Sequence, residues 1–187
     1  RTIKAGYAHS IPYGVFNKKI IEKVGGYNEH LHRNQDNDLN QRLIASGHKL
    51  YITDQTFCNY IIDYDLRSLY KYGLNNGVWN GKTLFINPDA MRLYHFVPAI
   101  FVIYVTSLFI LIGIGRFFIS MKLIILYNLP IIFYFILGLY ETLKAFKEKP
   151  SIYNSALPFI FFKFHFLYGL GTIKEILREI FLKITFS

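Results

Sequence analysis

Residues 33–43 decide how the soluble part of this chain folds, and they read Arg33-Asn34-Gln35-Asp36-Asn37-Asp38-Leu39-Asn40-Gln41-Arg42-Leu43. Polar and acidic residues come first and leucines at helical spacing follow, which predicts a helix with one buried face. Asn34, Asp36 and Asp38 cluster where this helix begins. Side chains of these types cap helix starts, and carboxylates there complement the helix dipole.

A glycine pair, Gly25-Gly26, lies just upstream of this helix. The pair predicts a tight turn that delivers the chain to the helix start. A carboxylate held at that point is well placed to face a cleft, and it is equally well placed only to cap the helix. Because acidic helix starts are common, the pattern alone favours capping.

Three stretches together resemble the acceptor-side signature of family 2 glycosyltransferases, and within them the succinoglycan-type exopolysaccharide enzymes. They are Gly-Gly-Tyr-Asn-Glu at 25–29, residues 33–43 and Ala-Ser-Gly at 45–47, and residues 10–19 fit the same subgroup. The resemblance implies that Asp36 is the general base that takes a proton from the acceptor hydroxyl. It also implies a set of residues that bind the acceptor and substrate: Gln35, which stands where a Glu is usual, Asp38, Arg42, Gly25, Gly26 and Trp79.

Trp79 ends the sequence Asn-Gly-Val-Trp, which resembles the segment where these enzymes carry an aromatic residue near the sugar-nucleotide site. Processive polymer synthases carry Gln-x-x-Arg-Trp, and only the Trp of that motif is present. We therefore expect a non-processive transferase. Direct displacement at the anomeric carbon would invert its configuration, and the resemblance implies inversion too.

Composition points to a membrane protein. Of the 187 residues 52% are hydrophobic, and the mean hydropathy of +0.26 is high for a wholly soluble chain. The net charge is +9, but the basic residues are scattered and many flank apolar runs. That arrangement suits an anionic membrane surface better than nucleic acid. Cys58 is the only cysteine, which excludes a disulfide framework, and we expect it to be buried.

Residues 1–64 are predicted to form the acceptor-side half of a GT-A domain, an α+β unit of a fold that is α/β as a whole. We expect a strand or loop over 7–16, a short helix over 17–24, and the Asp36 helix ending at Gly47. Two short strands are expected over 49–53 and 56–62 because both are rich in β-branched and aromatic residues.

Residues 65–95 are predicted to be an amphipathic interface helix, capped by Asp65, and a linker. Gly73, Gly77 and Gly81 recur every four residues, so a partner helix or a lipid surface could approach this backbone closely. Each glycine costs about 1 kcal/mol in a helix interior. The helix therefore needs outside support, which we expect from the membrane surface, or it breaks.

Residues 96–140 are predicted to be a transmembrane helical hairpin. Its two apolar runs, 96–115 and 123–140, are each about the 20 residues that span a bilayer. The basic residues outside the hairpin slightly outnumber the two in its connector, which predicts that the soluble part is cytoplasmic, at the inner cell membrane.

Residues 141–187 are predicted to be a cytoplasmic loop followed by interfacial helices. The apolar run 157–171 is short for a span, and we expect Gly169 to Thr172 to break it. Residues 173–184 then alternate apolar and charged faces as an interfacial helix does. For His165 we expect a polar contact at the interface.

Sugar transfer needs a base, charge stabilisation for the departing diphosphate, and exclusion of water. The family holds Mg²⁺ or Mn²⁺ with an Asp-x-Asp motif, and we expect those ligands in the full-length enzyme outside this chain. Asp63-Tyr64-Asp65 mimics the motif, but helix capping explains Asp65. Since the chain starts at Arg1 without Met, we interpret it as the C-terminal part of a longer transferase, inactive alone.

The predicted function is transfer of a sugar from a nucleotide-sugar donor to a saccharide acceptor linked to lipid, in cell-surface polysaccharide synthesis. One alternative is a non-catalytic, membrane-anchored module that binds a lipid-linked saccharide or a partner transferase. A small transporter is disfavoured because neither predicted span carries a charged residue.

Overall fold

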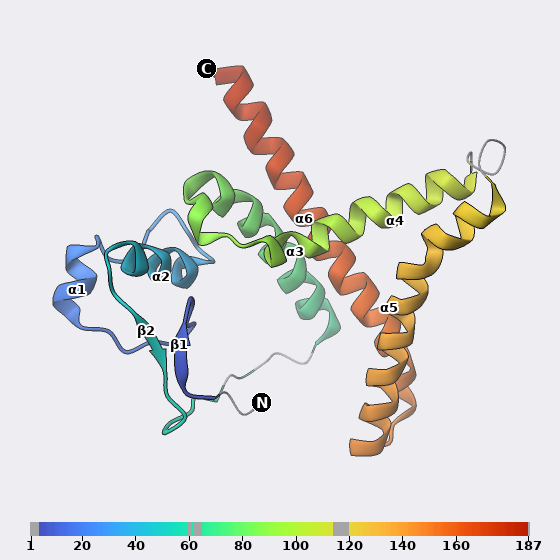
Figure 1. The fold of residues 1–187 in the computed structure, drawn as a ribbon, viewed down its shortest axis with the longest axis horizontal. Helices are drawn as coiled ribbons and strands as arrows, with labels where there is room; N and C mark the ends of the chain where they lie inside the picture. Colours follow the sequence, from blue (N-terminus) through green and yellow to red (C-terminus); the bar gives the residue numbers. More distant parts are fainter. Residues whose placement is uncertain (1–3, 60, 62–64, 114–119, 187) are drawn as a thin grey trace.

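The computed structural model describes residues 4–59, 61, 65–113 and 120–186. It is mostly helical, with a small sheet of two antiparallel strands, β1 (Gly6–Ala8) and β2 (Leu50–Ile52), in which Tyr7 pairs with Tyr51. Figure 1 shows the sheet with α1 (Lys18–Lys23) and α2 (Gln35–Ala45) as a head on one side of the longer helices. The head therefore contains both helices and strands, and this part of the α+β prediction is confirmed.

Helix α1 begins at a side-chain cap and is followed by the glycine turn that the sequence predicts. Asn17 caps α1 by accepting a hydrogen bond from the Lys19 backbone N–H at 3.0 Å. Gly25 and Gly26 follow with φ of +87° and +69°, a left-handed conformation that favours glycine. The buried face of α2 forms the core of the head, which contains Leu39, Leu43 and Leu50 with Ile11, Phe16, Ile20, Ile21 and Val24 packed around them.

The predicted strand over 56–62 is wrong for the residues described there, 56–59 and 61. A strand exists only where its backbone finds a pairing partner, and β2 pairs with β1 instead. The same segment leaves Cys58 exposed, so the expectation that this thiol is buried is also wrong.

Helix α3 (Leu66–Ile86) is continuous, and Asp65 caps it by accepting the Ser68 backbone N–H at 3.1 Å. Support for its glycines comes from α6 (Leu157–Phe186), which packs along it. A Cβ built on Gly77 would stand 1.9 Å from the carbonyl oxygen of Tyr168. The close approach that the glycine spacing predicts is therefore made by a partner helix of the same chain.

The predicted break between Gly169 and Thr172 is wrong, because α6 runs through it without interruption. A Cβ on Gly169 would lie 1.9 Å from the Pro98 carbonyl oxygen, and one on Gly171 would lie 2.4 Å from that of Leu74. These glycines are contact points between helices, and the packing there offsets their low helix propensity.

Helix α4 (Val97–Gly113) and helix α5 (Met121–Glu148) correspond to the two predicted spans, and most of their connector lies outside the described residues. Figure 1 shows them as a V on the opposite side of α3 and α6 from the head. Among the described residues three segments are long and apolar enough to cross a membrane: 93–111, 122–148 and 152–186. The prediction of two spans therefore missed a third candidate, α6, because it assumed that the glycines end the helix.

Candidate functional site

The start of α2 is built differently from an ordinary capped helix. Asn34 has φ 61° and ψ 16°, the left-handed conformation, and its side chain makes no capping hydrogen bond. Its amide Nδ2 donates instead to Asn80 Oδ1 at 2.9 Å and to Thr83 Oγ1 at 3.2 Å, both on α3. The expected N-cap interaction of Asn34 is thus wrong, because contacts to α3 hold the amide away from the helix start.

Asp38 is 2% exposed and is held by a buried network. Its Oδ2 accepts hydrogen bonds from Arg42 Nε at 3.0 Å and Nη2 at 2.7 Å, and its Oδ1 accepts one from Asn87 Nδ2 at 2.7 Å. Arg42 also donates to the carbonyl oxygens of Val24 and Gly26. Asp38, Arg42 and the glycine turn therefore fasten α2 to the preceding loop and to the end of α3.

Replacing Asp38 with Asn should lower the free energy of unfolding by about 3 kcal/mol. The substitution leaves the Arg42 guanidinium without a countercharge, and the loss is at the low end for buried pairs because Arg42 is 27% exposed. Denaturant unfolding of the protein in detergent measures it. Asp54→Asn, in the exposed turn after β2, is the matched control, and an unchanged midpoint in Asp38→Asn would refute the structural function.

A polar cavity of about 490 Å³ opens on the other side of the α2 start. Four parts of the fold meet around it: the head, α3, the turn η2 (Leu93–Phe96) that precedes α4, and α6. Amide, hydroxyl and charged side chains dominate its lining, which consists of Pro12, Tyr27, Arg33, Asn34, Gln35, Asp36, Asn37, Tyr72, Asn76, Asn80, His95 and Tyr168.

Asp36 lines this polar cavity, and no described residue donates a hydrogen bond to its carboxylate. It lies close enough to the His95 imidazole for the two to interact electrostatically. Gln35 also lines the cavity, although its amide nitrogen donates to the Leu31 carbonyl oxygen. Of the two acidic residues at the helix start, Asp38 is fully engaged and Asp36 is available to a ligand.

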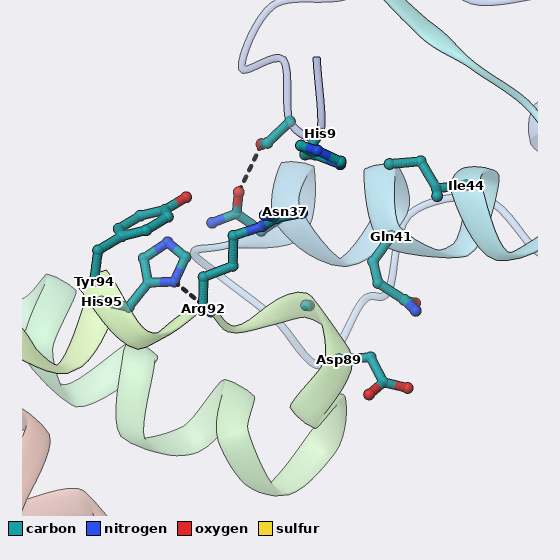
Figure 2. Close-up of a pocket in the computed structure, with 10 residues that line it drawn as sticks. His9, Asn37, Gln41, Ile44, Asp89, Arg92, Tyr94 and His95 are labelled. Atoms are coloured by element: carbon teal, nitrogen blue, oxygen red, sulfur yellow. Dashed lines mark hydrogen bonds between the residues drawn. The ribbon is translucent and has the colours of Figure 1, made fainter. Parts of the chain in front are cut away.

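His95 was not predicted from the sequence, because nothing in its neighbours distinguishes it from any histidine before an apolar run. Its Nδ1 accepts a hydrogen bond from the Arg92 backbone N–H at 2.9 Å, so the neutral ring carries its proton on Nε2. His95 and Asn37 also line a second, smaller cavity of about 200 Å³. Figure 2 shows Asn37 on α2 facing Arg92, Tyr94 and His95 there.

The hydrophobic helices contribute directly to the polar cavity. Asn80 of α3 is 1% exposed, and its Nδ2 donates to the Tyr168 hydroxyl at 2.9 Å and to the His95 carbonyl oxygen at 3.3 Å. Asn80 thereby joins α6 and the start of α4 to the head through Asn34. The cavity depends on the long helices as well as on α2.

Trp79, a predicted substrate-binding residue, is not among the residues that line the polar cavity. Its ring packs edge-on against His32 with centroids 5.3 Å apart, and Lys82 Nζ lies 4.8 Å from its centroid. Gly25, Asp38 and Arg42 line a separate hollow with Asn28, Ile86 and Asn87. The structure therefore brings Asp36 and Gln35 together and leaves the other predicted residues elsewhere.

No group of three or more His, Cys, Asp or Glu side chains able to hold a metal ion exists within the described residues. Asp63 and Tyr64 of the Asp-x-Asp mimic lie outside them, and Asp65 caps α3. The requirement for Mg²⁺ or Mn²⁺, with ligands outside this chain, stays a prediction.

Comparison with protein-family models, with curated proteins and with solved structures found no match to this chain.

Proposed function

We propose that this chain is the acceptor-side half of an inverting, membrane-anchored glycosyltransferase that moves a sugar from a nucleotide-sugar donor to a lipid-linked saccharide. The observation that carries the proposal is the Asp36 carboxylate, which lines a polar cavity and accepts no hydrogen bond from the described residues. A general base has to be within reach of the acceptor hydroxyl and free to take its proton.

The lining of the cavity suits a polyhydroxylated ligand. Each amide offers two donors and a carbonyl acceptor, and each tyrosine hydroxyl both donates and accepts. Asn37, Asn76 and Tyr72 supply such groups around Asp36. A saccharide ring presents hydroxyls that such groups can hydrogen-bond, whereas an apolar ligand would leave them unpaired.

The reaction at this site would be a single displacement. Asp36 takes the proton of the acceptor hydroxyl while the hydroxyl oxygen forms its bond to the anomeric carbon of the donor sugar. The bond from that carbon to the diphosphate oxygen breaks, the nucleoside diphosphate leaves with the electron pair, and the configuration inverts. Binding of the donor's nucleoside and of the metal ion that would stabilise the diphosphate is assigned to the nucleotide-binding half, outside this chain.

Three helices that could cross a membrane favour an acceptor that is itself in the bilayer. The polar cavity is lined by His95 directly before α4 and by Tyr168 within α6. A saccharide attached to a membrane lipid would thus reach Asp36 while its lipid stays in the bilayer.

The test is transfer by the full-length protein in its own membranes. Radiolabelled nucleotide sugars are supplied one at a time with membrane lipid extract, and label should enter the organic-soluble fraction for one of them. Membranes without the protein are the control. Absence of transfer from the common nucleotide sugars, by a protein that is folded and retains saccharide binding, would instead favour the non-catalytic module.

A further inference from the structure

Arg33 stands out in the polar cavity because its guanidinium is held firmly in place. Nη1 donates to Asn76 Oδ1 at 2.6 Å, and Cζ lies 4.8 Å from the centroid of the Tyr72 ring. Tyr72 and Asn76 are one turn apart on α3, so the helix presents both to the same side chain. Arg33 thus connects the head to α3 through a hydrogen bond and a cation–π contact.

The charge of Arg33 has no acidic partner within the part of the chain that the structure describes. Asp36 lines the same cavity, but no ion pair joins the two residues. Arg42, by contrast, pairs with Asp38 and also donates to the carbonyl oxygens of Val24 and Gly26. A guanidinium carries five N–H donors in a planar fork that matches phosphate oxygens, and Arg33 spends one of them on Asn76.

The cavity therefore carries both charges in its lining: a carboxylate that repels anions and a guanidinium that attracts them. An isolated anion would gain from Arg33 and lose to Asp36. A ligand with a phosphate at one end and a hydroxyl at the other would be oriented by both, with the hydroxyl directed to the carboxylate. Such a ligand would make use of both Arg33 and Asp36, which line the same cavity.

We propose that Arg33 binds the phosphate of a phosphate-linked saccharide and so orients the sugar toward Asp36. The inference rests on the proposed function, because it concerns the substrate of the same site. The phosphate belongs either to a polyprenyl-linked acceptor or to the nucleotide-sugar donor. Both sources share the chemistry that the guanidinium recognises, and the experiment separates them.

The experiment uses the full-length protein in phosphatidylcholine nanodiscs and isothermal titration calorimetry. One arm titrates geranyl diphosphate, a short polyprenyl diphosphate, and the other titrates UDP-glucose, with empty nanodiscs as blank. Arg33→Gln should weaken binding in one arm by about ten- to a hundredfold, the loss of one hydrogen bond between charged groups. Dependence on Arg33 in the geranyl diphosphate arm assigns it to the acceptor, and dependence in the UDP-glucose arm assigns it to the donor.

Two further variants separate charge recognition from a loss of fold. Asn76→Asp keeps Arg33 but gives it a carboxylate partner, so it should weaken the same arm as strongly as Arg33→Gln. Arg67→Gln removes an exposed charge from the first turn of α3, outside the cavity, and should leave both affinities within twofold. The proposal would be overturned if Arg33→Gln changed the affinity for both probes by less than twofold, or if the unmodified protein bound neither probe.

The titrations need no sugar transfer, so this inference and the proposed function fail separately. If the Asp36→Asn protein transfers sugar normally, Asp36 is not the general base. A phosphate site that depends on Arg33 could still be shown by the titrations. Conversely, suppose that Arg33→Gln leaves both affinities unchanged while Asp36→Asn abolishes sugar transfer. That result would refute the phosphate site and support Asp36 as the general base.

Discussion

Replacing Asp36 with Asn in the full-length protein should lower the rate of sugar transfer by about 10²–10⁴-fold, the usual contribution of a positioned general base. Asn has nearly the shape of Asp but cannot take the acceptor proton. Since no described residue donates a hydrogen bond to this carboxylate, the substitution breaks no such bond and loses only the charge interaction with the helix dipole, about 0.3–1 kcal/mol. Radiolabel transfer at saturating donor and acceptor measures the loss.

The controls for this prediction come from the same helix and from the head. Asp36→Asn should lose no more than about 1 kcal/mol of unfolding free energy, from its interaction with the helix dipole, and bind donor nearly as well. Asp38→Asn, by contrast, should mainly lower the free energy of unfolding, because its buried carboxylate is held in the network with Arg42. Asp54→Asn should change neither property. Full transfer activity in Asp36→Asn would remove this residue from the mechanism.

Gly77→Ala should destabilise the packing of α3 on α6 by about 3 kcal/mol, the upper end for added volume in a packed contact. The new Cβ would stand 1.9 Å from the Tyr168 carbonyl oxygen and 2.9 Å from the Thr172 backbone nitrogen. Backbone atoms cannot rotate aside as a side chain can, so the helices have to separate. That loss far exceeds the helix propensity of about 1 kcal/mol gained by replacing glycine.

Thermal unfolding of the purified protein in detergent measures this effect. Gly113→Ala at the end of α4 is the matched control, because a Cβ there has no atom within 4 Å, and it should be neutral or slightly stabilising. Gly77→Ala should also reduce sugar transfer, since Asn80 and Tyr168 of the polar cavity meet across the same pair of helices. A Gly77→Ala protein as stable as the unmodified one would show that α3 and α6 do not pack this closely.

Local patterns predicted several elements correctly because their physical causes lie within a few residues. Asp65 caps the helix that follows it, and the glycine pair 25–26 takes up positive φ after α1. The apolar runs that became α4 and α5 are visible without any tertiary information. Two predictions failed because distant segments decide the outcome: the described residues of 56–62 form no strand, and α6 continues through its glycines, which pack against α3 and α4.

The sequence by itself determined most of the helices, the Asp65 cap, the apolar character of α4 and α5, and the presence of a carboxylate at the start of α2. Only the tertiary structure decided which carboxylate is available. Asp36 and Asp38 are two residues apart, which places their side chains about 200° apart around a helix. The segments that pack on each side of α2 therefore decide which carboxylate is buried. Arg42 and Asn87 enclose Asp38, whereas α3, η2 and α6 leave Asp36 beside a cavity. His95 and Tyr168 join that cavity from distant segments, and no local pattern could bring them beside Asp36.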